Sequence, residues 1–400
     1  MKCSPICLYG TNGYAVVDEM QLLSAGRWLM TSQRSFRLEY TRATIKLWCL
    51  KDADDVYCSA SFDIFAGYKK FTVSLTRDEK FATLAITIDN ATHGVLQIYD
   101  IPLIERSEAE FLHNSTPRMK KVIPRPSRAR GTIHEVSIHD KVIAATFVDL
   151  STESLGHSYQ VLLVNTNTWS QVLLHPKFDE PFTRLSIKLY HDRILFIGSF
   201  HDNVLVRTFH LPSCMVHQQL AGRSSVWDPL NRDDSRIVED MGDYEEFLIS
   251  HMPNVQDFFV SESDSFSDTI PSLPKSLSFL FYAAALGDSE GKGVLVRLFL
   301  DPGHQGQDSL MQREVFGAPR DSSVKLVRIG VTGRRAVWIE QNWETDGFRV
   351  IKAHFPDENV DWSTVHVLLP PYPSLPFSPQ MCNSLAFDET TGRLCVGVAT

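Results

Sequence analysis

Residues 331–338 read Val331-Thr332-Gly333-Arg334-Arg335-Ala336-Val337-Trp338: the end of an apolar strand, a tight polar turn with arginine, and a second, strongly apolar strand. This pattern recurs at residues 22–30, 73–84, 136–144, 189–196 and 387–396, and residues 277–281 supply a second strand without a clear turn. The second strands begin near residues 28, 81, 142, 194, 277, 336 and 394. Seven strand-and-turn units of similar length predict a β-propeller, because each repeat must stack on its neighbours to bury its apolar face.

The predicted fold is all-β: a single WD40-like β-propeller over residues 1–400, with seven blades that are each a four-stranded antiparallel sheet. The long apolar runs are interpreted as third strands, buried on both faces between blades. Apolar-x-apolar-aromatic segments are interpreted as outermost strands, at residues 45–48, 96–100, 206–209 and 296–299. Residues 6–9 share this pattern, so we expect the ring to be closed by an N-terminal strand that completes the last blade. A chain truncated within a blade is the alternative.

Three segments near the end of the chain, residues 334–340, 343–346 and 383–397, resemble the C-terminal propeller of fungal F-box-type proteins. In that family an N-terminal helical F-box docks on a cullin ubiquitin-ligase adaptor, and the propeller holds partners. The resemblance therefore implies substrate recognition for ubiquitination. Residues 1–50 read as strands and turns, so a cullin-ligase adaptor is expected as a partner only if an F-box is supplied elsewhere. The chain also departs from the WD repeat, because Cys49 rather than Asp follows Trp48.

The net charge of −9 belongs to one segment. The whole chain has 39 basic and 48 acidic residues, and residues 221–270 alone hold twelve acids and three arginines. The remainder is neutral, which argues against a general nucleic-acid binder, because such a protein needs a basic face. We interpret residues 221–270 as an acidic insertion, partly disordered, whose residues 258–260 supply part of a blade strand.

The acidic insertion has two features of a regulatory segment. Ser261 and Ser265 each precede an acidic residue by three positions, and acid-directed kinases recognise this spacing. Phosphorylation would add about −1.5 to −2 charges at each site. The alternative is an insertion that a surface loop tolerates without any role. A short amphipathic helix is expected from the helical spacing of Met241, Tyr244, Phe247 and Leu248.

A second charged segment, residues 117–130, is basic and contains no acid. Its three prolines predict an irregular loop. Clustered Arg and Lys form strong charge-assisted hydrogen bonds, so this basic loop is a candidate site for an acidic peptide, a phosphate group or nucleic acid. A solvated inter-blade loop is the alternative, and the lack of interleaved aromatic residues disfavours single-stranded nucleic acid. The candidate residues are Arg118, Lys120, Lys121, Arg125, Arg128 and Arg130.

Motifs for catalysis, metal binding and cofactor binding have little support in the sequence. It has no H-E-x-x-H and no G-x-S-x-G, and residues 287–293 lack the Ser or Thr that follows the lysine of a P-loop. We therefore predict a non-catalytic scaffold that binds protein or peptide partners and needs no cofactor or metal. The alternatives are a propeller hydrolase or lyase with a site in the central channel, or a phosphate- or nucleic-acid-binding protein that uses residues 117–130.

The sequence also bears on location. The longest apolar run, residues 277–286, is half the length of about 20 residues that a membrane-spanning helix needs, so no membrane partner is expected. The first residues lack the apolar core of a secretory signal. Seven cysteines include no C-x-x-C pair, which is typical of a reduced intracellular protein, and we expect the cytoplasm or nucleus.

Overall fold

The structure is a computed structural model of the chain. It divides into two compact units: a first unit of residues 1–65, 103–116 and 252–400, and a second unit of residues 66–102 and 117–251. Helix among the described residues is limited to α1 (Ser213–Val216) and the 3₁₀ helix η4 (Pro379–Met381). The structure describes residues 15–23, 25–35, 42–52, 55–66, 68–76, 78–90, 93–105, 116–127, 129–149, 158–176, 184–200, 203–216, 236–238, 241–251, 255–261, 276–283, 291–299, 311–318, 321–356, 364–367 and 377–398.

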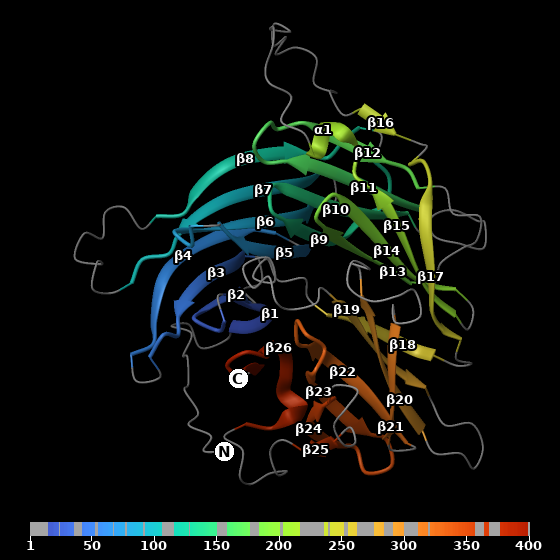
Figure 1. Cartoon of the computed structure of the whole chain (residues 1–400). Helices are drawn as coiled ribbons and strands as arrows, with labels where there is room; N and C mark the ends of the chain where they lie inside the picture. The colour runs from blue at the N-terminus through green and yellow to red at the C-terminus, as the bar shows by residue number, and fades with distance from the viewer. Residues whose placement is uncertain are drawn as a thin grey trace, which may run out of the picture. The chain divides into compact units, whose positions relative to one another are not determined.

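The first unit contains three four-stranded antiparallel sheets and one two-stranded sheet (Figure 1). Each sheet follows chain order, so neighbouring strands are joined as hairpins or by longer connections. The sheets are β1 (Ala15–Leu23), β2 (Trp28–Ser35), β3 (Arg42–Cys49) and β4 (Tyr57–Phe65); β18 (Val255–Val260), β19 (Ser276–Ala283), β20 (Gly291–Phe299) and β21 (Met311–Ala318); β22 (Ser322–Ile329), β23 (Arg335–Asn342), β24 (Gly347–His354) and β25 (Thr364–Val367); and β26 (Cys382–Asp388) with β27 (Arg393–Val398).

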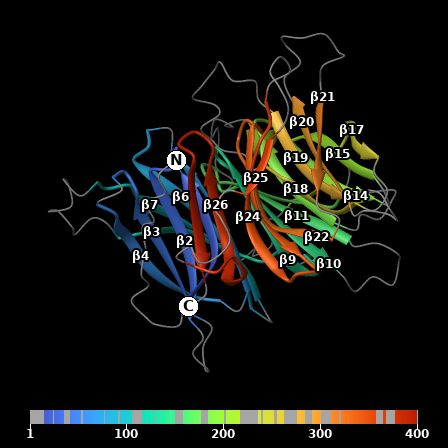
Figure 2. The same ribbon diagram turned by 90° about the horizontal axis from the view of Figure 1, so that it is seen from below.

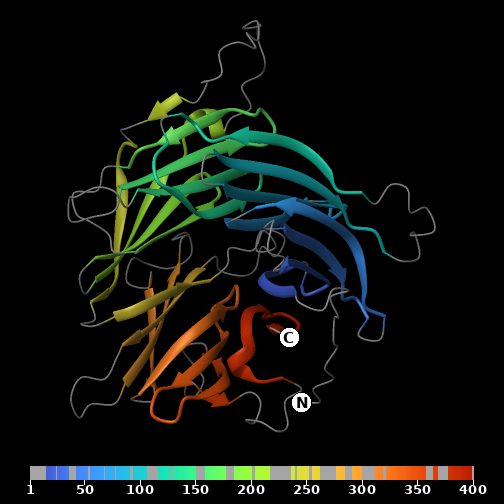
Figure 3. The same cartoon turned by 180° about the vertical axis from the view of Figure 1, so that it is seen from behind.

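The second unit contains three more such sheets, one of which gains a fifth strand. That strand, β16 (Arg236–Val238), pairs parallel with the outer strand β12 and is the short yellow arrow at the upper left of Figure 3. The sheets are β5 (Tyr68–Leu75), β6 (Phe81–Asn90), β7 (His93–Pro102) and β8 (Arg118–Pro124); β9 (Thr132–His139), β10 (Val142–Asp149), β11 (Ser158–Asn165) and β12 (Gln171–Leu174); and β13 (Arg184–Tyr190), β14 (Arg193–Phe200), β15 (Asn203–His210) and β17 (Tyr244–His251).

The sheets stack face to face as the blades of a β-propeller. In the second unit the first strands β5, β9 and β13 contact one another in that order. In the first unit β22 contacts β26, and β26 contacts β1, as Figure 2 shows for the red and blue strands. The facing surfaces are apolar: Phe196 and Leu163, from neighbouring blades, share one buried cluster. The sequence prediction of an all-β propeller with four-stranded antiparallel blades is therefore confirmed.

The predicted number of seven blades is wrong. The described residues form six blades of four strands, one of which is extended by β16, and β26 and β27 form a two-stranded sheet. The repeat detected in the sequence consists of a first strand, a turn and a second strand. Because β26 and β27 supply that pattern by themselves, counting repeats overestimates the number of complete blades. Residues 6–9, which were expected to close the ring, lie outside the described residues.

The strand positions within each blade also need correction. The long apolar runs are second strands rather than third strands, and β10 is buried along its whole length. The apolar-x-apolar-aromatic segments are third strands, in β3, β7, β15 and β20, rather than outermost strands. Each of these blades has a further strand outside, namely β4, β8, β17 or β21. These outer strands expose many side chains, so their apolar pattern is too weak to be read from the sequence.

The turn between the first and second strands explains why the same residue pattern recurs in the sequence. It requires a positive φ, which Gly333 and Gly392 adopt readily and which Asp140 and His191 adopt at φ 49° and 51°. The residue after the third strand then donates its N–H to a carbonyl in this turn, at 2.7 Å in four blades. The pairs are Leu50 with Arg27, Thr166 with Lys141, Leu211 with Asp192, and Phe355 with Arg334.

The acidic insertion contains strands where a helix was predicted. Residues 244–251 form β17, which pairs with β15, so the prediction of a short amphipathic helix is wrong. The exposed edge of β15 overrides the local helical spacing, because Glu246 pairs with Arg207 at 2.6 Å and Glu245 with Arg193 at 2.9 Å. The expectation that residues 258–260 supply part of a blade strand is confirmed by β18.

Replacing Gly333 with alanine tests the close packing of the repeated turn. Its φ is +68°, and an added Cβ would lie 2.1 Å from the Ser278 Oγ of the neighbouring blade. Gly242 is the matched control, because its φ of +76° carries the same strain while a Cβ there meets nothing within 4 Å. We expect Gly333→Ala to lower the free energy of unfolding by about 1–3 kcal/mol more than Gly242→Ala, measured by urea denaturation. Equal losses would show that only the backbone conformation matters.

Candidate partner-binding edge

Strand β8 carries the first half of the basic segment. The prediction of an irregular loop over residues 117–130 is therefore wrong for residues 118–124, which pair antiparallel with β7 from Arg118 opposite Asp100 to Pro124 opposite Val95. The prolines do not prevent the strand, because Pro117 precedes it and Pro124 ends it. The candidate site is thus held on the outer strand of a blade.

The solvent-facing side chains of β8 combine positive charge with apolar surface. Arg118 and Lys120 are exposed, and the Lys120 Nζ lies 3.0 Å from the Asp100 Oδ2 on β7. Met119 is 51% exposed and Val122 is 45% exposed. We call Arg118, Met119, Lys120 and Val122 the β8 surface.

The remaining basic candidates are placed differently. Lys121 is half-buried, with its Nζ 5.6 Å from the centre of the Trp169 ring in the next blade. Arg130 is exposed, and its main-chain N–H donates to the Gln160 side chain at 2.8 Å. Arg128 lies outside the described residues. The structure therefore does not gather the six predicted residues on one surface.

Arg125 has a structural role. Its Nε donates to the Ala129 carbonyl at 3.1 Å, and its Nη2 donates to the Gly131 carbonyl. The guanidinium also lies over the Phe147 ring, 5.2 Å from its centre. These contacts fix the connection from β8 to β9, so the guanidinium of Arg125 is already used in contacts within the protein.

The edge of β8 is protected against the addition of another strand. It is the last strand of its sheet among the described residues. A β-bulge places Lys120 between the pairs Ile98–Lys121 and Tyr99–Met119. Bulges and lysines on an edge strand hinder pairing with a further strand. The β8 surface is therefore suited to bind a partner through its side chains rather than its main chain.

The acidic side chains of β17 do not cover the β8 surface. Both strands belong to the second unit, and the blade of β9–β12 stands between their blades, as Figure 1 shows. Glu245 and Glu246 pair instead with arginines on β14 and β15 of their own blade. The positive charge of β8 is therefore not masked by β17.

The first predicted phosphorylation site is buried. Ser261 follows β18 and is 2% exposed, and its Oγ accepts a hydrogen bond from the Ser278 N–H at 3.0 Å. Its own N–H donates to the Ser278 carbonyl at 2.8 Å. A kinase would reach this hydroxyl only after β18 leaves β19. Phosphorylation stays a prediction, and Ser265 lies outside the described residues.

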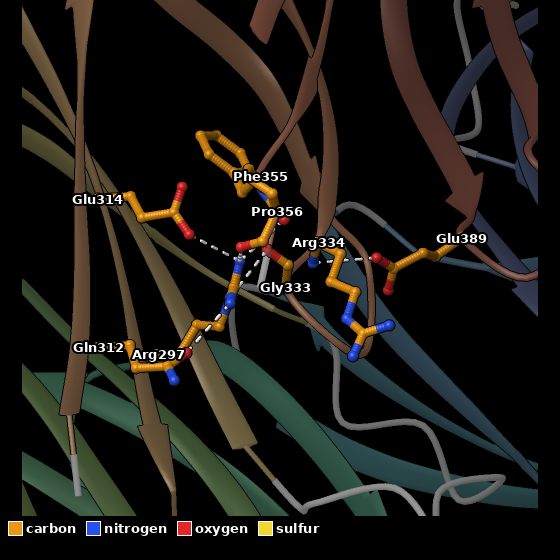
Figure 4. A network of polar contacts seen from close by, with 8 residues as sticks. All are labelled: Arg297, Gln312, Glu314, Gly333, Arg334, Phe355, Pro356 and Glu389. Atoms are coloured by element: carbon orange, nitrogen blue, oxygen red, sulfur yellow. Dashed lines mark hydrogen bonds and ion pairs between the residues drawn. The ribbon is translucent and has the colours of Figure 1, made fainter. Parts of the chain in front are cut away.

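A buried arginine links two blades of the first unit (Figure 4). Arg297 on β20 is 3% exposed, and its Nη2 lies 3.1 Å from the Glu314 Oε1 of the same blade. Its Nε donates to the Gly333 carbonyl at 3.3 Å and its Nη2 to the Phe355 carbonyl at 3.0 Å, both in the next blade. Gln312 accepts a further bond at 3.2 Å. Because its donors are used within the fold, Arg297 is structural.

A buried carboxylate forms a second link between the same two blades. Glu340 on β23 is 2% exposed, accepts a hydrogen bond from the Tyr282 hydroxyl of β19 at 3.2 Å, and pairs with Arg349 on β24. Burial, reinforced by the Glu340 charge, raises the pKa of Tyr282 well above its usual range. Tyr282 therefore stays protonated and donates to Glu340 at neutral pH.

Charged residues on the first strands join neighbouring blades. Glu135 on β9 accepts bonds from the Ser186 hydroxyl at 3.1 Å and the Ile187 N–H at 3.0 Å on β13. Arg328 on β22 donates to the Leu385 carbonyl of β26 at 2.8 Å. In the described part of the chain, no group of three or more His, Cys, Asp or Glu residues could hold a metal ion.

Helices in the described residues are all too short to cross a membrane.

Comparisons with known proteins give weak structural similarity. No protein-family model and no curated protein matches the chain. The chain is similar to the Pyrococcus horikoshii acylaminoacyl peptidase, with 11% identity and a TM-score of 0.48, over 96% of this chain and 49% of that one. It is also similar to the β-propeller domain of the trilobed protease from Pyrococcus furiosus, with 11% identity and a TM-score of 0.47, over 94% and 88%. For the Dos1 propeller the identity is 12% and the TM-score 0.44, over 96% and 76%. The chain thus spans about half the length of the peptidase.

Replacing Arg297 with methionine tests the first inter-blade link. The change leaves Glu314 without its buried partner, and the Gly333 and Phe355 carbonyls lose the hydrogen bonds that Arg297 donates. We therefore expect a loss of about 3–5 kcal/mol in the free energy of unfolding. Lys292→Met at the exposed start of the same strand is the control, and we expect it to cost less than about 0.5 kcal/mol. Chemical denaturation measures both. Similar losses in the two variants would contradict the structural role of Arg297.

Replacing Tyr282 with phenylalanine tests the second link through its pH dependence. At pH 7 Glu340 loses a buried donor, so we expect Tyr282→Phe to cost about 1–3 kcal/mol. Because the pKa of Tyr282 is raised in the folded state, its contribution is full below about pH 10 and is lost as the pH rises above the unfolded value. Denaturation between pH 7 and pH 11 should show the two proteins converging at high pH. A pH-independent difference would contradict this.

Proposed function

We propose that this protein is a non-catalytic β-propeller that binds an acidic protein or peptide partner through the β8 surface. One observation carries the proposal: Arg118 and Lys120 stand beside the exposed Met119 and Val122 on the outer strand of a blade. Partner carboxylates would form charge-assisted hydrogen bonds with the cations, and partner apolar groups would cover the two apolar side chains. The strand is held in a sheet before binding, so little ordering is required.

A catalytic role has less support. Three of the buried ionisable groups, Arg297, Glu340 and Tyr282, are engaged in contacts between blades. Glu135 likewise accepts a hydrogen bond from β13, the first strand of the neighbouring blade. A propeller hydrolase or lyase would need such groups to face a substrate.

Recognition of a ubiquitination substrate is a narrower form of the proposal. It rests on the resemblance of residues 334–340, 343–346 and 383–397 to F-box-type proteins, and it requires an F-box supplied elsewhere. Affinity purification from native cells tests this form of the proposal. A recovered cullin adaptor would support it, and a reproducible partner without the adaptor would contradict it.

The location of the protein is a separate proposal. The free thiols of the five described cysteines support a reducing location, the cytoplasm or nucleus.

Charge reversal at Arg118 tests the β8 surface. A displayed library of random peptides is selected on the wild-type protein, and we expect the enriched peptides to be acidic with apolar residues. Arg118→Glu should weaken their binding about tenfold, because it replaces attraction by repulsion. Arg313→Glu, the same change on the outer strand β21, is the control and should leave binding unchanged.

Two outcomes would contradict the proposal. Enriched peptides that bind Arg118→Glu as tightly as the wild type would exclude the β8 surface. A labelled single-stranded oligonucleotide that binds the wild type, with a steep dependence on salt and with loss in Arg118→Glu, would favour the nucleic-acid alternative instead.

A further inference from the structure

The outer strand β12 differs from other outer strands. Strands β4, β8, β17 and β21 have seven to nine residues, and each exposes at least one charged side chain. Strand β12 has four residues and no charge, and Val172, Leu173 and Leu174 are buried. Its pairing with β11 is regular, whereas β4, β8 and β17 pair through a bulge. The four-residue β25 exposes Thr364 and His366.

An edge with these properties needs a cover. Edge strands are protected by charge, by a bulge or by another segment that covers them, and β12 has neither charge nor bulge. In this chain the cover is β16, which pairs parallel with β12 through Arg236, Ile237 and Val238, opposite Val172, Leu173 and Leu174. Figure 1 places β16 beside β12 at one edge of the sheet.

The cover is weak by the standards of strand pairing. It has three residues, and parallel pairs are slightly less stable per residue than antiparallel ones. It follows β15 and α1 in the chain, so it lies outside the run of residues that forms β9 to β12. A segment of the same chain competes at an effective concentration of about the millimolar range, which a longer partner strand can overcome.

We propose that the outer edge of β12 is a strand-addition site for an extended, apolar segment of a partner protein, and that β16 occupies this site in cis as a competitor. Main-chain hydrogen bonds would supply the affinity, and alternate side chains the specificity. The segment that pairs with this edge in a parallel strand contains the β-branched residues Ile237 and Val238. This site is separate from the β8 surface and does not depend on it.

The first measurement asks whether β16 covers the edge. Hydrogen exchange of residues 171–174 is followed by mass spectrometry in the full-length chain. We expect slow exchange in the wild type and faster exchange in the triple variant Arg236→Gly, Ile237→Ser and Val238→Gly. The single variant Ile237→Pro should behave in the same way, and it serves if the triple variant fails to fold. Ile237→Val keeps a β-branched residue and should keep the protection. Equally slow exchange in all four proteins would overturn the proposal.

The second measurement asks whether the uncovered edge takes a strand from another molecule. A displayed library of random peptides is selected on the folded triple variant and then tested on the wild type. We expect enriched peptides rich in β-branched residues, with at least about tenfold weaker binding to the wild type, where β16 competes. They should also restore slow exchange in residues 171–174 of the triple variant. Arg118→Glu should not change their binding, which separates this site from the β8 surface.

A chemical signature distinguishes strand addition from a side-chain contact. In a parallel strand, alternate residues direct their main-chain groups to the neighbouring strand. N-methylation of the selected peptide, one position at a time, should therefore abolish binding at alternate positions only. No enrichment on the folded variant, equal binding to wild type and variant, or uniform sensitivity to N-methylation would each overturn the proposal.

Discussion

The left-handed turn between the first two strands of a blade is the constraint on which the other contacts depend. A positive φ costs a residue with a side chain about 1–2 kcal/mol, yet Ala25, Asp140 and His191 all adopt it. The cost is offset because the turn reverses the chain tightly and presents a carbonyl to the residue that follows the third strand. One turn thereby fixes three strands in register.

The same turns are also the points where blades meet in the first unit. Arg297 reaches the Gly333 carbonyl from one side, and Glu389 accepts the N–H groups of Thr332 and Arg334 from the other. Arg393 donates to the Gly26 carbonyl in the next blade along. A side chain from one blade thus satisfies main-chain groups of its neighbour, so a defect in one turn weakens two blades.

The strands that are buried on both faces could be located from the sequence. A continuous apolar run can be recognised without knowing which residues pack against it. Sequence reasoning failed for outer strands such as β8 and β17, where exposed charges and bulges erase the alternation and pairing with a neighbour decides the structure. The basic composition of the β8 surface was readable. The structural role of Arg125 was not, because its partners are two carbonyls and the ring of Phe147, which no local pattern reveals.

The contact of β26 with β1 has a consequence for biosynthesis. The Ser384 hydroxyl donates to the Val17 carbonyl across 367 positions of the chain. At a translation rate of about 5–20 residues per second, the ribosome makes Ser384 about 20–70 seconds after Val17. Throughout that interval the flank of the first blade that β26 covers stays open on the nascent chain. Such long-range closure slows folding, and it exposes strands β1 and β2 to aggregation and to chaperones until the last strands emerge.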